Sequence, residues 1–222
     1  MSTYIFLWRI NSRDIPRAIF HMAVDRLSLR NSRGVTFFKS LGIGDGVSFT
    51  PSDADIRSWA LLVTFDRDLT ELEKLPTVTA WRKFALEEEF YQLSTITSHG
   101  LWAKQEPFIS EVAKDWAGEV ATITRARIRW HQNLRFWRSV PPVTESLHGS
   151  DGLIRAIGIG EAPIGLQGTF SHWRSQEDLR IFAYKGAAHQ KAIALTAEHN
   201  WYAEELFARF AITAHRKRTL RQ

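Results

Sequence analysis

The sequence predicts an α+β fold built from two similar halves that follow one another along the chain. In each half, a strand-like apolar run precedes a helical pattern, two more strand-like runs, a second helix and a last strand. Two glycine-rich runs, residues 42–46 and 158–161, fall at corresponding places, as do the strand-like runs 59–65 and 168–171. We therefore expect two consecutive β-α-β-β-α-β units.

The first half is expected to span residues 1–107. Its apolar opening, residues 3–8, predicts a strand. The helix that follows should turn one apolar face inward, made of Ile15, Ile19, Met22 and Ala23. The other elements expected in this half are strands at residues 35–38, 59–65 and 91–96, a turn at residues 42–46, and a helix through Trp81, Phe84 and Ala85.

The second half is expected to span residues 119–213, between a linker at residues 108–118 and a basic tail at residues 214–222. Ser175 and Asp178 predict a helix start, because both residue types bind the free N–H groups of a first turn. The other elements expected here are strands at residues 120–128, 153–157, 168–171 and 201–210, a turn at residues 158–161, and a helix around residues 134–137.

Both halves match the ferredoxin-like unit, and two such units in one chain can pair their sheets. We predict a pseudo-dimeric α+β barrel with its helices outside. A doubly wound sheet is the weaker alternative, because no expected strand is followed by a nucleotide-binding glycine loop. A chance similarity between two α+β halves is the other alternative.

The composition favours a packed protein and excludes several kinds of site. Of 222 residues, 44% are hydrophobic, which is enough to bury a substantial core. The absence of cysteine excludes disulfides, iron–sulfur clusters, zinc–thiolate sites and a thiolate-ligated haem. No nucleic-acid-binding motif accompanies the net charge of +5, and no apolar stretch approaches the roughly 20 residues that span a bilayer. We expect a cytoplasmic protein that does not bind nucleic acid.

The last third of the chain carries a family resemblance. Its residues are Ile157-Gly-Ile-Gly-Glu161, Gln167-Gly-Thr-Phe-Ser-His-Trp173, Phe182-Ala-Tyr184, His189 and Trp201-Tyr-Ala-Glu-Glu-Leu-Phe-Ala-Arg-Phe210. This pattern resembles the spheroidene monooxygenase family of bacterial carotenoid biosynthesis, and a looser similarity covers most of the chain. The resemblance implies a haem-dependent monooxygenase that inserts oxygen into a hydrophobic, carotenoid-like substrate.

His189 is the candidate ligand of the haem iron. Aligning residues 80–83 with residues 188–191 places Trp81 of the first half opposite His189 of the second. Only the second half therefore has an imidazole at this position. Neutral histidine is a common proximal ligand of haem.

The helical pattern supports this interpretation of His189. On a helix, His189 shares a face with Ala192 and Ala197, whose small side chains leave room for a planar group. The structural alternative is a core histidine bonded to a backbone carbonyl. His172 and His199 compete with His189 as ligands.

Arginines on the opening strand of the second half are candidates for contacting the cofactor. Arg125, Arg127 and Arg129 alternate along this strand and therefore share one face. If that face lies inside, Arg127 could meet a haem propionate or polarise bound oxygen. If it lies outside, the three arginines form a solvated surface.

The other expected site residues are Lys185, as a weaker propionate partner, and Phe170 and Trp173, as walls of the cofactor pocket. Arg127 and Trp173 are the catalytic candidates. The competing interpretation of the two aromatic residues is core packing, which is the usual place of an aromatic residue in a strand.

Electrons are expected from a separate donor such as a ferredoxin, because no flavin or nicotinamide motif is visible. The basic helix with Arg13, Arg17, Arg26 and Arg30 fits peripheral contact with an anionic membrane and fits an ordinary solvated surface equally well. The sequence leaves open a haem-dependent dehydratase or peroxidase, a non-enzymatic haem-binding protein and a cofactor-free oxygenase. It also leaves open the oligomeric state, including a homo-oligomer.

Overall fold

The computed structural model describes residues 1–49, 53–112, 114–129, 144–161, 168–185 and 202–221. The strands are β1 (Ser2–Ile10), β2 (Val35–Gly44), β3 (Ala54–Phe65), β4 (Ala85–Gly100), β5 (Val120–Ile128), β6 (Leu153–Gly160), β7 (Gly168–Trp173) and β8 (Tyr202–Thr219). The helices are α1 (Ile15–Arg30), α2 (Leu69–Leu72), α3 (Pro76–Arg82) and α5 (Gln176–Lys185), and residues 144–148 are also helical.

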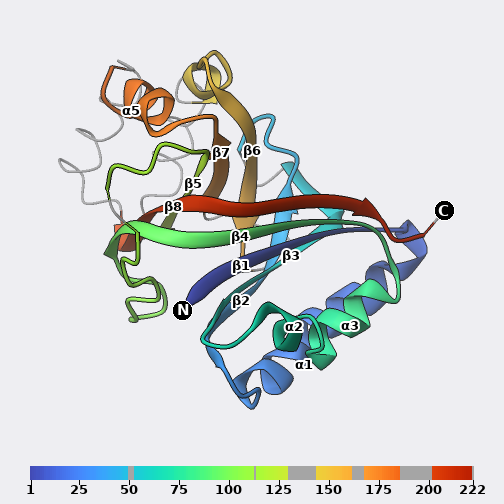
Figure 1. Ribbon diagram of the computed structural model, residues 1–222. Helices are drawn as coiled ribbons and strands as arrows, with labels where there is room; N and C mark the ends of the chain where they lie inside the picture. The colour runs from blue at the N-terminus through green and yellow to red at the C-terminus, as the bar shows by residue number, and fades with distance from the viewer. Residues whose placement is uncertain (50–52, 113, 130–143, 162–167, 186–201, 222) are drawn as a thin grey trace.

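The strands form a closed antiparallel barrel in the order β1-β3-β2-β6-β7-β5-β8-β4. Helices α1, α2 and α3 lie against one side of the barrel and α5 lies on the other (Figure 1). The order β4-β1-β3-β2 in the first half corresponds to β8-β5-β7-β6 in the second, and each set is a ferredoxin-like sheet. The predicted internal repeat and the predicted α+β barrel are confirmed.

The two halves join along two seams of unequal length. β4 pairs with β8 over a long stretch, from Glu87 opposite Thr219 to Gly100 opposite Leu206. β8 continues to Thr219, so that most of the expected basic tail, residues 214–222, is part of this strand. An ion pair of 2.7 Å between Arg218 of β8 and Glu88 of β4 supports this extension.

The second seam is short and is made by the two Gly-Ile-Gly runs. Gly42 pairs with Gly160 and Ile43 pairs with Ile159 across β2 and β6. Residues 42–44 and 158–160 belong to β2 and β6 and not to the expected turns. In the first run the chain leaves the strand after Gly44 and bends at Gly46, whose φ is +79°. Both runs lie on sheet edges, whose free N–H and C=O groups find partners only when the barrel closes.

Local sequence patterns predicted most other elements. The strand expected at residues 120–128 is β5, with the same bounds. The helix start at Ser175 is confirmed, because its hydroxyl donates to Asp178 Oδ2 at 2.7 Å and accepts from the Asp178 N–H at 3.1 Å. The helix expected through Ala85 is too long, since α3 ends at Arg82 and Ala85 begins β4. The helix expected around residues 134–137 lies outside the described residues.

The predicted inward face of α1 is confirmed for Met22, which is buried, and for Ile15, which packs against the core, and it is wrong for Ile19 and Ala23, which are exposed. Its buried residues are Ala18, Met22, Asp25 and Leu29. Ile19, expected to face inward, is 47% exposed. A hydrogen bond of 2.7 Å from Trp81 Nε1 to Asp25 Oδ2 ties the Asp25 side of the helix to α3, which explains why a charged residue faces inward.

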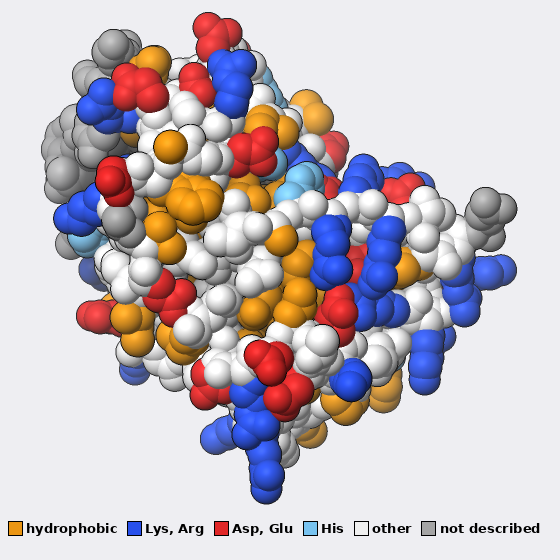
Figure 2. Space-filling model, viewed as in Figure 1, with side chains coloured by type: hydrophobic (Ala, Val, Ile, Leu, Met, Phe, Trp, Pro, Cys, Tyr) orange, Lys and Arg blue, Asp and Glu red, His pale blue; other side chains and the backbone are white. Residues whose placement is uncertain are grey.

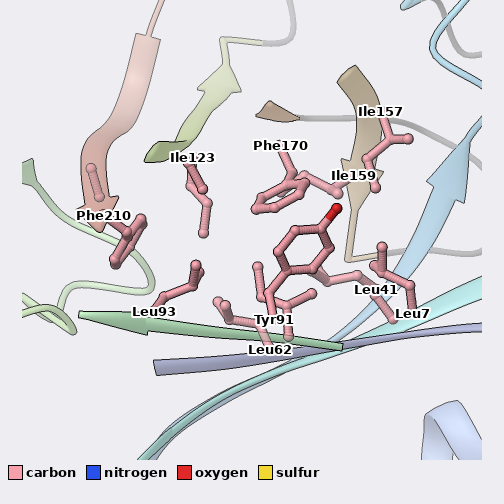
Figure 3. Close-up of a cluster of buried hydrophobic side chains, with 14 of the residues drawn as sticks. Leu7, Leu41, Leu62, Tyr91, Leu93, Ile123, Ile157, Ile159, Phe170 and Phe210 are labelled. Carbon is pink, nitrogen blue, oxygen red and sulfur yellow. The ribbon is translucent and has the colours of Figure 1, made fainter. Parts of the chain in front are cut away.

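The barrel interior is a packed apolar core. Tyr91, Phe170 and Phe210 meet aliphatic side chains from the surrounding strands there (Figure 3). The rings of Tyr91 and Phe170 contact edge to face, with centroids 5.1 Å apart. Among the described residues, no helix has the length and apolar character needed to cross a membrane.

Candidate functional site on the outer face of the second sheet

The two sheets carry different side chains on their outer faces, which lie toward the helices. In the second half, Ser171 of β7, Thr122 of β5 and Arg209 of β8 lie side by side in one row across the sheet. The hydroxyl oxygens of Thr122 and Ser171 are 2.6 Å apart. In the next row, Thr124 is exposed although β5 lies between β7 and β8. The centre of this sheet face is therefore lined by small polar side chains, of which Thr122 and Ser171 are buried and Thr124 is exposed.

The equivalent face of the first half is filled. The row that corresponds to Ser171, Thr122 and Arg209 consists of Leu61, Phe6 and Phe90. All three belong to an apolar cluster under α1 and α3, and none is more than 1% exposed. The repeat thus uses one outer face for core packing and leaves a polar face at the same place in the other half.

Arg209 is the basic residue of this polar face. Its Nη1 donates to Gln176 Oε1 at the start of α5, at 3.2 Å. Its Nε is buried and has no hydrogen-bond partner in the part of the chain that the structure describes. A buried guanidinium N–H without a partner favours a bound acceptor, such as a carboxylate or a polarised oxygen.

Trp173 forms one wall of the polar face. It is fully buried, and its ring stacks on Phe182 of α5 with centroids 5.3 Å apart. Its Nε1 donates to Ser171 Oγ at 2.8 Å. The indole is thereby held in one orientation at the edge of the hydroxyl row.

Two other predicted site residues lie on the opposite face of the sheet. Side chains alternate along a strand, so that Phe170 points into the barrel while Trp173 points out. Phe170 is a core residue rather than a wall of the outer face. Arg127 lies on the same face of β5 as Arg125, two residues nearer the end of the strand, and its side chain is exposed. The structure therefore does not bring Arg127, Phe170 and Trp173 together on one face, and their roles at a cofactor stay predictions.

Arg125, and not Arg127, is the buried arginine of β5. It is 6% exposed and pairs with Glu204 and, at 3.2 Å, with Glu161. Burial tends to raise the pKa of Glu161, but hydrogen bonds from Lys39 and Trp102 outweigh it and hold the pKa below its usual value. This ion network closes one end of the barrel.

His172, a competing ligand candidate, lies at the other end of the barrel interior. Its ring contacts Tyr91 edge to face, and its Nε2 is 3.0 Å from Glu119 Oε2. Burial lowers the pKa of His172 and outweighs the opposing effect of Glu119. Because His172 faces the barrel interior, it does not share the face of Arg209.

The remaining candidates fall at or beyond the end of α5. Lys185 is the last residue of that helix. His189 and His199 lie outside the described residues. Among the residues that are described, no group of three or more histidine, aspartate or glutamate side chains could hold a metal ion.

The closed barrel and its one polar outer face define a pseudo-dimeric α+β-barrel protein with a candidate ligand site in its second half. The crystal structure of an aldoxime dehydratase in complex with butyraldoxime shares this fold, with a TM-score of 0.58 and 10% sequence identity over 95% of this chain and 79% of that one. No family model matches the chain.

Proteins similar in sequence identify the family, whereas the similar crystal structure shows the fold alone. A spheroidene monooxygenase of Rhodobacter capsulatus is 36% identical over 205 residues, which cover 89% of this chain and 84% of that protein. A spheroidene monooxygenase of Cereibacter sphaeroides is 30% identical over 86% of this chain, which spans 60% of that protein. The chain belongs to the spheroidene monooxygenase family. It is an enzyme, an oxidoreductase of the monooxygenase class.

Proposed function

We propose that this monooxygenase depends on haem and inserts oxygen into a hydrophobic, carotenoid-like substrate. The relatives are named for spheroidene, a carotenoid, and the family resemblance implies haem. The observation that carries the proposal is the polar row on the second sheet, at the place where the first half is filled by Leu61, Phe6 and Phe90.

The described residues fit the sheet side of a haem site. Thr122, Thr124 and Ser171 have small side chains where the first half has Phe6 and Leu61, which favours a flat group over this part of the sheet. The buried Nε of Arg209 offers a charged N–H to an acceptor. We propose His189 as the iron ligand and Lys185 as a propionate partner, both on the basis of the sequence. When bound, haem supplies the redox-active iron that activates oxygen.

The protein residues would then bind, orient and shield the reactants. We propose that Arg209 donates a hydrogen bond to the oxidant or to a propionate, a role that the sequence analysis gave to Arg127. Trp173 and Phe182 provide an apolar wall against which a hydrocarbon substrate can be buried. Excluding water at this wall strengthens the hydrogen bonds of the hydroxyl row and of Arg209.

The proposal includes two partners. Monooxygenation places one atom of O2 in the substrate and reduces the other to water, which consumes an electron pair and two protons. We propose that an external donor such as a ferredoxin supplies the electrons, with peroxide as the alternative oxidant. We also propose that the enzyme contacts a membrane peripherally from the cytoplasmic side, where a carotenoid substrate would be dissolved.

Visible absorption spectra of the purified protein and of His189→Ala test the cofactor. We expect a Soret band that shifts normally in the ferric, ferrous and carbon monoxide states and is lost or altered in His189→Ala. A band unaffected by the substitution would assign the iron to His172 or His199. Absence of haem after reconstitution would overturn the proposal. Haem without oxygen-dependent turnover would support a dehydratase, a peroxidase or a haem-binding protein instead.

A further inference from the structure

Helix α1 is apolar on the side that faces away from the barrel. Pro16, Phe20, Ala23 and Leu27 follow one another at spacings of four, three and four residues, which places them on one stripe. Phe20 is 61% exposed and Leu27 is 69% exposed. The core contacts of the helix come from the opposite side, through Ala18, Met22, Asp25 and Leu29. The outward stripe is therefore separate from the packing of the fold.

Basic side chains flank this apolar stripe on both sides. Arg17 and Arg26 lie to either side of it, and Arg30 extends the row at the end of the helix. All three are exposed, and the guanidinium of Arg17 also lies over the ring of Phe84, 4.5 Å from its centroid. The one acidic residue of α1 is Asp25, which is buried and accepts a hydrogen bond from Trp81. In Figure 2, basic and hydrophobic side chains lie together along the lower right edge of the molecule, where Figure 1 shows α1.

This arrangement is complementary to an anionic lipid surface. An interfacial helix buries its apolar stripe at the level of the headgroups, while flanking cations remain beside the phosphates. Each arginine near an anionic leaflet adds attraction, and no exposed carboxylate on α1 opposes it. A second copy of the chain would bring the same arginines against each other, which costs energy. The charge pattern therefore favours lipid as the occupant.

We propose that α1 is the membrane-docking surface of this enzyme, with Phe20 and Leu27 inserted among anionic phospholipid headgroups and Arg17, Arg26 and Arg30 beside the phosphates. This inference deepens the membrane contact within the proposed function and is independent of the haem chemistry. Docking through α1 leaves the second sheet and its polar face on the other side of the barrel, as Figure 1 shows for α1 and α5.

Vesicle flotation with the purified full-length protein tests the proposal. Vesicles of phosphatidylcholine alone are compared with vesicles that also contain phosphatidylglycerol. We expect the wild type to float with the anionic vesicles and to be released by salt, because the Debye length falls to about 3 Å at about 1 M. Phe20→Ser with Leu27→Ser should lower the partition coefficient at least about tenfold. Arg26→Gln and Arg30→Gln should each lower the partition coefficient about fivefold, also when they are combined in one variant.

Matched variants elsewhere on the surface serve as controls. Ile109→Ser removes an apolar side chain that is 65% exposed, and Arg174→Gln with Arg180→Gln removes two exposed arginines at α5. These controls should float as the wild type does. Circular dichroism and thermal melting establish that every variant is folded.

Three results would overturn the proposal: no flotation of the wild type with anionic vesicles, equal flotation of the Phe20→Ser, Leu27→Ser variant, or loss of flotation in the controls. Light scattering distinguishes the competing occupant, since a wild-type dimer that Phe20→Ser with Leu27→Ser converts to a monomer would assign α1 to a second copy. Because neither haem nor turnover is needed, failure here is distinguishable from failure of the proposed reaction.

Discussion

The hydroxyl oxygens of Thr122 and Ser171 lie 2.6 Å apart on the outer face of the second sheet, at the position that Phe6 and Leu61 occupy in the first. Both pairs join the central strand of a half to its neighbour, and both face away from the barrel interior. In the first half, the apolar side chains at this position pack beneath helices α1 and α3. The other has small hydroxyl groups there, which can accommodate a ligand.

Placing the bulky side chains of the first half at the same positions of the second sheet should strongly reduce haem uptake. Thr122→Phe with Ser171→Leu copies the Phe6–Leu61 pair onto the second sheet. Overpacking typically costs about 1–3 kcal/mol, and about 1.4 kcal/mol is a tenfold loss of affinity. We therefore expect haem content per chain, measured as the pyridine haemochrome, to fall about tenfold or more. Thr213→Phe, on an exposed part of β8, should retain full haem content. Normal uptake in the double variant would exclude this face as the site.

Arg209 should control the affinity of the haem-loaded protein for anions. A hydrogen bond to a charged group contributes about 1.5–3 kcal/mol, so that Arg209→Gln should raise the Kd for fluoride or azide about tenfold or more. Arg209→Lys should recover part of the affinity, and the exposed Arg174→Gln should match the wild type. Spectral titration measures the Kd, with haem content as the control for folding. An unchanged Kd in Arg209→Gln would mean that Arg209 serves α5 alone through Gln176.

Gly100 should be irreplaceable at the end of the long seam. Its φ is +87°, and an added Cβ would collide with the Glu205 carbonyl oxygen of β8. We expect Gly100→Ala to lower the free energy of unfolding by at least about 2 kcal/mol. Gly149→Ala is the matched control, because its Cβ would lie 3.4 Å from the Glu145 carbonyl oxygen in ordinary contact. Urea unfolding of the two variants tests this, and equal stabilities would contradict it.

Glu88 should make stability depend on pH in the acid range. Burial tends to raise the pKa of Glu88, but hydrogen bonds from Arg82 and Trp8 outweigh it and hold the pKa below its usual value. A carboxyl group whose pKa is lowered on folding contributes stability above the pKa of the unfolded chain, about 4.3. That contribution is lost as the pH falls through the folded pKa.

The substitution Glu88→Gln should therefore destabilise the protein near neutral pH, by about 3 kcal/mol. It should also flatten the dependence of the unfolding free energy on pH between about 5 and 3. Glu71→Gln, which breaks an exposed pair with Arg67, should change stability by less than about 1 kcal/mol. Urea unfolding across this pH range measures both effects, and parallel pH profiles for wild type and Glu88→Gln would refute the assignment.

Much of the fold could be predicted from sequence because strands have a strict period of two. The alternation at residues 120–128 predicted β5 with its observed bounds. Runs without such a pattern were harder, and the Gly-Ile-Gly runs were interpreted as turns although they are strand edges. Their conformation depends on a partner strand more than a hundred residues away, which no local pattern reveals.

The candidate site was less predictable, because a strand pattern tells which residues share a face and not which face is inside. Arg125 and Arg127 were correctly placed together, but Arg125 is enclosed by Glu161 and Glu204 while Arg127 is exposed. Arg209 was missed. A signal for it exists in the sequence, since it interrupts the apolar run around Phe207 and Phe210.

The sequence by itself determined the order of elements, the internal repeat and the family, because these depend on local periodicity and on residues matched one by one. Only the tertiary structure decided that the barrel interior is filled around Tyr91 and Phe170 and that Arg209 joins Thr122 and Ser171 on the outer face. The physical reason is that inside and outside are defined only after β2 meets β6 and the barrel closes.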